Sequence, residues 1–215
     1  MKNNINIRHR MKAAVSKGLQ ECHRLKTDKE EIETKYIQPV MNKVFRKLKF
    51  TDMQYVFPSQ NGKYDHLFMK NNCFILCEAK SSVRSRKLDT KHKMAKVLTQ
   101  TICYLRSLYK EYGLQIRCVM LYDEFCAYVV PINKTITELF KFRGVNWKIS
   151  PSTKGAYKPL SRKVEELLNA RRIYYREISD KEYNTFTLCP IIDSFDKFSI
   201  HSDQRTGNRN FNLVI

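Results

Sequence analysis

Two acids and a lysine are spaced so that they could meet at one end of a strand pair. Asp65 is followed thirteen positions later by Glu78, and Lys80 comes two positions after that. The residues before Glu78, Phe74–Cys77, are apolar, as expected of a buried central strand. Because side chains alternate between the faces of a strand, Glu78 and Lys80 project to the same side. The polar segment Lys70–Asn72 predicts a tight hairpin that brings Asp65 back beside Glu78.

Carboxylates that converge at the end of a buried strand call for a compensating charge. Each carboxylate loses several kcal/mol on leaving water unless something offsets the loss. A divalent cation is the usual solution, and oxygen ligands suit Mg²⁺ or Mn²⁺. Asp65 and Glu78 would then be metal ligands at a phosphate, and Lys80 would hold or polarise the attacking water. A buried ion pair between Lys80 and either acid, without chemistry, is the alternative that this triplet leaves open.

The charge of the chain favours a polyanionic partner. The chain has 215 residues, the length of one domain or of one domain with an appendage. It contains 40 Lys and Arg against 21 Asp and Glu, which gives a net charge of +19. Nucleic acid is the favoured partner, because contacts of Lys and Arg to phosphates supply most non-specific affinity. A structural basic protein would have the same charge, but such proteins rarely place their few acids at the end of an apolar strand.

The cysteines and the hydropathy indicate a protein of a reducing compartment. The seven cysteines form no CxxC pair and no Cys/His cluster at zinc spacing, so we interpret them as reduced core thiols. No run approaches the ~20 apolar residues that span a bilayer. The N-terminus lacks the apolar stretch of a secretory signal. We therefore expect a cytoplasmic protein with no membrane partner.

Periodicity predicts the elements that must position these residues. A capping box at Thr27–Glu30 predicts a helix that continues to Leu48, with Pro39 expected to kink it or to cost it a turn. Glu33 lies at the edge of the buried stripe of this helix, or it is an ordinary solvent-facing acid of a first turn. The elements that follow are a strand or strand pair in Phe50–Pro58, the hairpin of Tyr64–Met69 and Phe74–Lys80, a helix from Asp89 or Thr90 to Tyr112 that Gly113 stops, and strands at Ile116–Tyr122 and Cys126–Ile132.

This order of elements indicates an α/β fold, a mixed β-sheet flanked by helices. We divide the chain into a basic N-terminal arm (1–27), a core (28–132) and a C-terminal extension (133–215) that packs on the core. The arm either contacts nucleic acid or is a solvated lead-in. In the extension we expect helices at Thr135–Phe142 and Ser161–Arg172, extended or irregular chain at Val145–Ser152, a strand region at Ile191–Ile200 and a polar tail near 201–210.

Further groups could complete a site around the acids. Gln100 and Tyr104 lie one turn apart on one side of the long predicted helix. His66, next to Asp65, should point to the opposite face of its strand. The segment Ser81–Lys96 follows the strand of Glu78, where it could hold a phosphate backbone or form a mobile charged loop. Its basic residues of interest are Arg84, Arg86, Lys87, Lys91 and Lys93.

In their order these residues resemble the PD-(D/E)xK nuclease superfamily. Glu33–Pro39 is similar to the first helix of restriction-enzyme nuclease domains, and Asp65 with Glu78-Ala79-Lys80 is similar to the superfamily's central motif. Gln100–Tyr104 fits the Q-x-x-x-Y pattern of the RecB-type branch. The resemblance covers about residues 28–132. Tyr64 stands at the position of the proline that gives the superfamily its name, a proline that many members lack.

The resemblance implies a restriction-endonuclease-like fold with an αβββαβ core. It also implies a Mg²⁺- or Mn²⁺-dependent endonuclease that hydrolyses phosphodiester bonds of DNA. Such an enzyme would be the nuclease part of a restriction-type system. Asp65, Glu78 and Glu33 would be the metal ligands, Glu33 from the outer shell or on a second ion. Lys80 would serve the attacking water, and Gln100 would steady the site or the DNA. Tyr104 and the basic residues after Glu78 would contact the nucleic acid.

Other functions remain open at this point. An RNA endonuclease of the cap-snatching type would share the chemistry, although its sites usually add a histidine from the first helix. A non-catalytic nucleic-acid-binding module on a nuclease fold would keep only the basic surface. Cleavage of both DNA strands generally needs two sites, which makes a homodimer plausible.

Overall fold

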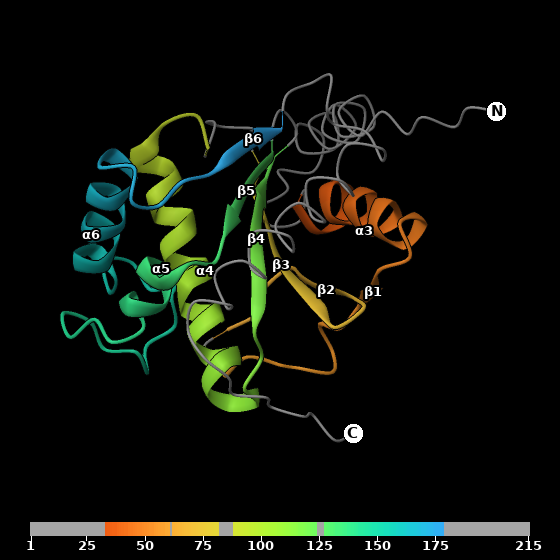
Figure 1. Ribbon diagram of the computed structural model, residues 1–215, viewed down its shortest axis with the longest axis horizontal. Helices are drawn as coiled ribbons and strands as arrows, with labels where there is room; N and C mark the ends of the chain where they lie inside the picture. The colour runs from red at the N-terminus through yellow and green to blue at the C-terminus, as the bar shows by residue number, and fades with distance from the viewer. Residues whose placement is uncertain (1–32, 61, 82–87, 124–126, 179–215) are drawn as a thin grey trace, which may run out of the picture.

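The described residues form a six-stranded mixed β-sheet with helices on both faces (Figure 1). A computed structural model describes residues 33–60, 62–81, 88–123 and 127–178. Among the described strands the spatial order follows the chain order from β1 to β6; β3 and β4 are parallel, and the other neighbours are antiparallel. The predicted α/β class with a mixed sheet is thus confirmed. The elements are η1 (Glu33–Ile37), α3 (Gln38–Lys47), β1 (Thr51–Asp52), β2 (His66–Lys70), β3 (Cys73–Ala79), α4 (Lys91–Tyr112), β4 (Ile116–Tyr122), β5 (Ala127–Pro131), α5 (Lys134–Leu139), α6 (Lys158–Asn169) and β6 (Arg176–Ile178).

The first helical segment changes its geometry near its proline. The π-helical turn η1 passes directly into α3, and Pro39 is the second residue of α3. Because proline has no backbone N–H, it cannot continue the hydrogen-bond ladder at that point, which fits the expected disturbance. Met41 and Phe45 on the inner face of α3 are fully buried, and Phe45 stacks on Phe68 of β2 with ring centroids 4.1 Å apart. The predicted capping box at 27–30 lies outside the described residues.

The predicted hairpin that carries the acids is confirmed. Asn71 and Asn72 connect β2 and β3 with φ values of 50° and 58°. Two central residues at positive φ are typical of the tight turns that match strand twist, and asparagine tolerates this conformation. His66 pairs with Cys77 in the antiparallel ladder. This register places Asp65 and Glu78 side by side at the open end of the hairpin.

The long helix α4 begins and ends where the sequence predicts. Thr90 caps its N-terminus by accepting a hydrogen bond from the backbone N–H of Lys93, and Gly113 ends it at φ 66°. The helix links β3 to β4, as a parallel pair requires. It packs between the sheet and α6, and its apolar residues form the main core. Figure 1 shows α4, α5 and α6 on one face of the sheet and α3 on the other.

Two strand predictions need correction. The predicted strand or strand pair at Phe50–Pro58 is limited to Thr51 and Asp52. There the Asp52 carboxylate accepts a hydrogen bond from the backbone N–H of Gln54, which favours a turn over a continued strand. The sequence pattern also misses the three-residue edge strand β6, which pairs with β5.

In the C-terminal extension the predicted helices occur with shifted ends, as α5 and α6, and 145–152 is irregular. The arm (1–27), the strand region at 191–200 and the tail near 201–210 lie outside the described residues. Within the described ranges no helix combines the length and apolar character needed to cross a membrane. The cysteines of the described residues are buried thiols outside any disulfide, as predicted; they are Cys73, Cys77, Cys103 and Cys118.

Candidate active site

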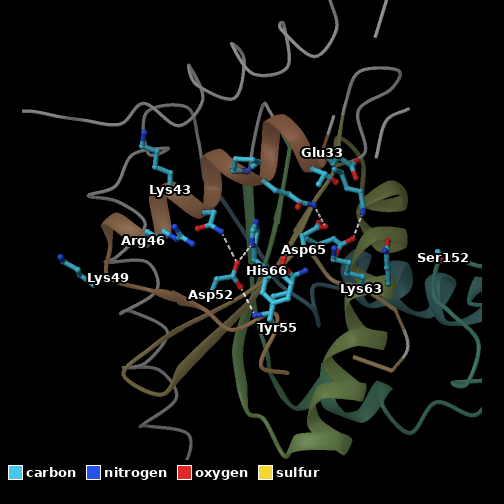
Figure 2. Close-up of a pocket in the computed structure, with 18 residues that line it drawn as sticks. Glu33, Lys43, Arg46, Lys49, Asp52, Tyr55, Lys63, Asp65, His66 and Ser152 are labelled. Carbon is cyan, nitrogen blue, oxygen red and sulfur yellow. Dashed lines mark hydrogen bonds and ion pairs between the residues drawn. The ribbon is translucent and has the colours of Figure 1, made fainter. Parts of the chain in front are cut away.

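A cleft of about 1300 Å³ lies between α3 and the open end of the hairpin (Figure 2). One wall comes from η1 and α3, and the other from β1, the turn after it and the adjoining ends of β2 and β3. The long helix α4 contributes Gln100, and the irregular 145–152 segment contributes Ser152. Figure 2 shows Glu33 and Asp65 toward one end of the cleft and Lys43, Arg46 and Lys49 toward the other. The cleft therefore has an acidic end and a basic end.

Asp65 is fixed by two short hydrogen bonds. Its Oδ1 accepts from Nε2 of Gln38 at 2.6 Å, and its Oδ2 accepts from the backbone N–H of Ala79 at 2.6 Å. Burial, together with the nearby charge of Glu78, raises the pKa of Asp65 to about 7. The two carboxylates that the sequence predicts to converge are thus close enough to act on one another. Gln38 is a partner that the sequence analysis does not identify.

Glu78 and Lys80 form a buried pair with one oxygen left over. Nζ of Lys80 lies 2.6 Å from Oε1 of Glu78, whose side chain is only 3% exposed. Oε2 of Glu78 is buried and has no hydrogen-bond partner. Burial raises the pKa of Glu78 despite the attraction of the Lys80 ammonium. Burial alone would lower the pKa of the Lys80 ammonium, but the charges of Glu78, Glu33 and Asp65 outweigh burial and raise that pKa.

Glu33 reaches this pair from the first helical segment. Its carboxylate accepts a hydrogen bond from the backbone N–H of Ser81, directly after the strand that carries the pair. Its charge contributes to the raised pKa values of Asp65 and Lys80. The structure therefore brings together Glu33, Asp65, Glu78 and Lys80. The spacing predicts this for the last three, and only the resemblance implies it for Glu33.

Gln100 and Tyr104 lie beside the acidic end, but the tyrosine is not on the surface. Nε2 of Gln100 donates to the hydroxyl of Tyr104 at 3.0 Å, and Gln100 lines the cleft. Tyr104 is 3% exposed, and its ring centroid lies 6.1 Å from that of Tyr64. Burial and the charge of Glu78 raise the pKa of Tyr104 to about 12. Tyr104 thus supports Gln100 and offers almost no surface to a nucleic acid.

The basic residues at the cleft differ from those that the sequence singles out. Arg84, Arg86 and Lys87 lie outside the described residues. Lys91 is exposed and Lys93 pairs with Asp89 at 3.0 Å, and neither lines the cleft. The basic residues that do line it are Lys43, Arg46, Lys49 and Lys63. Lys43 and Arg46, three positions apart, could have been found from helical periodicity, because they lie off the apolar stripe of α3.

The acidic end has the donor atoms for a divalent cation. Among the described residues, no group of three or more His, Cys, Asp or Glu side chains is arranged to hold a metal ion. Asp65 and Glu78 nevertheless supply neighbouring carboxylates, and Oε2 of Glu78 is a buried acceptor without a donor. Such an oxygen is costly to bury, and a hard cation would satisfy it. The residues present therefore fit Mg²⁺ or Mn²⁺.

A second polar cluster, which the sequence analysis misses, stands farther along the same cleft. Nδ1 of His66 lies 2.7 Å from Oδ2 of Asp52, and the His66 ring stacks on Phe68. His66 lines the same cleft as Asp65, so the expectation that it points away from Asp65 stays a prediction. Burial would raise the pKa of Asp52, but the hydrogen bond and charge of His66 outweigh it and lower that pKa. Asn42 of α3 also donates to Asp52. The cluster ties α3 to β1 and β2.

We expect Asp52→Ala to lower the free energy of unfolding by about 2 kcal/mol, because it leaves buried donors without an acceptor. Urea denaturation followed by circular dichroism measures the change. Asp89→Ala, which removes an exposed carboxylate paired with Lys93, is the control and should cost less than about 0.5 kcal/mol. Equal losses in the two variants would contradict a structural role for the Asp52–His66 pair.

The metal-free protein should become less stable as the pH rises from about 4 to about 7. Asp65 has a folded-state pKa of about 7 against an ordinary value of 3.8, so the folded state holds a proton that the unfolded chain has released. Stability falls with pH wherever the folded state binds more protons. A cation competes with that proton, so Mn²⁺ should raise the melting temperature more at about pH 8 than at about pH 5. Melting curves in EDTA and in Mn²⁺ test this, and Asp65→Asn should flatten the slope.

Comparisons of the chain with protein-family models, with curated proteins and with solved structures found no match. The fold defines a mixed α/β protein, and the cleft gathers three acids and a lysine at the end of a hairpin.

Proposed function

We propose that this protein is a Mg²⁺- or Mn²⁺-dependent nuclease with a restriction-endonuclease-like core that hydrolyses phosphodiester bonds, with DNA favoured over RNA. One observation carries the proposal: Asp65, Glu78 and Lys80 converge at the open end of the hairpin, and Oε2 of Glu78 is buried there without a donor. The order of helix, three strands, helix and strand supports the same core.

The residues of the chain divide the work of hydrolysis. Asp65 and Glu78, with Glu33 nearby, would hold the cation. A bound Mg²⁺ or Mn²⁺ would neutralise charge on the phosphate and acidify a water molecule. The ammonium of Lys80 would orient the attacking water and offset the negative charge that develops on the phosphate.

Other contacts keep the acids in place. Gln38 and the backbone N–H of Ala79 fix both oxygens of Asp65, so that its carboxylate cannot rotate freely. Fixed groups aimed at developing charge need little reorganisation during the reaction. Gln100, held by Tyr104, borders the same space and would steady the bound strand.

The proposal is tested by incubating the full chain with supercoiled plasmid, single-stranded DNA and single-stranded RNA. Each substrate is combined with Mg²⁺, Mn²⁺ or EDTA, and the products are separated on gels. We expect cleavage with either metal and none in EDTA. Binding without cleavage of any substrate under all metal conditions would overturn the proposal.

One observation favours a non-catalytic alternative. Lys80 is already paired with Glu78, and both oxygens of Asp65 already have donors, so the cluster could be a purely structural network. In that case EDTA leaves binding unchanged, and Asp65→Ala affects stability alone. For the cap-snatching type, residues 33–47 of the first helical segment contain no histidine. Cleavage restricted to RNA in the same experiment would support that type.

A further inference from the structure

We propose that the cleft takes a single strand of nucleic acid, with a base stacked on Tyr55 and the phosphates along the basic face of α3. This inference rests on the proposed function, which places the scissile phosphate at Asp65, Glu78 and Lys80. It adds the form of the substrate and the path that the strand follows away from the acids.

Tyr55 is an exposed aromatic ring held at the rim of the cleft. Its side chain is 86% exposed, and it lines the cleft in the turn after β1. The turn is well fixed: the backbone N–H groups of Val56 and Phe57 both donate to the carbonyl of Met53, and the Phe57 ring packs edge-on against Phe74. A ring presented on a rigid turn loses little entropy when a base stacks on it. Such stacking is worth about 1–3 kcal/mol per base and tolerates any sequence.

By the basic face of α3 we mean Lys43 and Arg46 on the helix together with Lys49, two residues past its end. This face continues from the acidic end. Lys43, Arg46 and Lys49 line the cleft and are exposed, and among the described residues none of them has an acidic partner. Exposed lysines elsewhere do pair with acids, as Lys163 does with Glu166. Glu33 opens η1, which passes directly into α3, so the acidic and basic residues lie along one continuous helical segment.

Figure 2 shows Tyr55 between Lys49 and Lys63, on the side of the cleft that faces α3. A strand that leaves the acids along the cleft would therefore have phosphate-binding groups on one side and an aromatic face on the other. Proteins that hold single strands combine these two features, a positively charged groove and stacking aromatics.

The depth of the acids argues against an intact duplex. Glu78 is only 2% exposed, so the scissile phosphate must descend toward the floor of the cleft. The bases of a duplex are paired and stacked inside it, so they have no free face for Tyr55. A flexible single strand can bend into the cleft and offer an unstacked base.

The test measures binding by fluorescence anisotropy in EDTA, where the proposed cleavage cannot occur. The probes are a labelled twelve-nucleotide single-stranded DNA, the same sequence as RNA, and the DNA duplex. The full-length wild type is compared with Tyr55→Ala, with Tyr55→Phe, which keeps the ring, and with Tyr174→Ala. Tyr174 is 55% exposed and lies outside this cleft, so Tyr174→Ala is the matched control.

We expect the wild type to bind a single strand more tightly than the duplex. Tyr55→Ala should weaken single-strand binding about tenfold, and Tyr55→Phe should retain most of it. The DNA and RNA arms show which sugar the cleft prefers. A stronger affinity for the duplex, or equal binding by the wild type and Tyr55→Ala, would overturn the inference.

The basic face is tested separately. The triple variant Lys43→Ala/Arg46→Ala/Lys49→Ala should reduce the slope of log affinity against log salt by about 2, as three lost phosphate contacts on a single strand predict. The control Lys158→Ala/Arg162→Ala/Arg172→Ala removes equal charge from exposed positions on and after α6. Equal slopes in the two triples would contradict the proposed path. Because binding is measured without metal, the two proposals can fail separately. Single-strand binding without cleavage in the metal assays would refute the nuclease and support the single-strand site. Cleavage of duplex DNA alone would support the nuclease and refute the single-strand site.

Discussion

Lys80→Ala should reduce metal-dependent cleavage by about a thousandfold or more, because it removes the ammonium that lies beside Glu78 at the proposed reaction centre. Binding of nucleic acid should stay close to that of the wild type, since the basic residues of α3 lie elsewhere in the cleft. Single-turnover cleavage and anisotropy, measured on the same preparations, separate the two effects. Lys110→Ala, which removes an exposed lysine near the end of α4, is the control and should cleave normally.

Lys80 also neutralises a buried acid, so its loss could affect folding. Removal of one partner from a buried pair leaves the other uncompensated and can cost about 3–5 kcal/mol. Lys80→Arg keeps the charge beside Glu78 but places a planar guanidinium where an ammonium is needed. We expect this variant to be folded, by circular dichroism, and nearly inactive. Wild-type cleavage by either variant would refute the proposed role of Lys80.

Asp65→Asn should abolish both the stabilisation by Mn²⁺ and the cleavage, the latter by at least about a hundredfold. The amide keeps the shape of the side chain and an acceptor for Ala79, but it lacks the charge that a cation needs. In EDTA the variant should be as stable as the wild type or more stable near neutral pH, because a buried carboxylate has been removed. Thermal melting and cleavage assays measure both effects.

The matched control for this variant is Asp89→Asn, which changes an exposed acid beside the N-terminus of α4. It should retain the response to Mn²⁺ and the cleavage rate. If Asp65→Asn melted with the same Mn²⁺ shift as the wild type, the cation would bind elsewhere, and the assignment of Asp65 would be wrong.

The hairpin and the long helix could be predicted because local residues specify them. Two asparagines at the turn fix the register of β2 against β3, and that register alone brings Asp65 to Glu78. Thr90 and Gly113 mark the ends of α4 by backbone chemistry that short-range sequence encodes. The pairing of Lys80 with Glu78 follows from strand alternation.

The missed features depend on contacts between distant segments. Gln38 reaches Asp65 across twenty-seven positions, and no local pattern distinguishes it from any other polar helical residue. The pairing of Asp52 with His66 arises only because β1 lies beside β2. Tyr104 was expected at the nucleic acid, but the packing of α4 on the sheet buries it. Spacing within a helix shows which residues share a face, whereas the covering of that face depends on the rest of the fold.

Anomalous diffraction from crystals soaked in Mn²⁺ would locate the cation itself. We predict a peak between the Asp65 carboxylate and Oε2 of Glu78, with the Lys80 ammonium displaced from its present contact or sharing Glu78 with the ion. A map with no peak at these carboxylates, and with the Lys80 ammonium still bound to Glu78, would contradict the account.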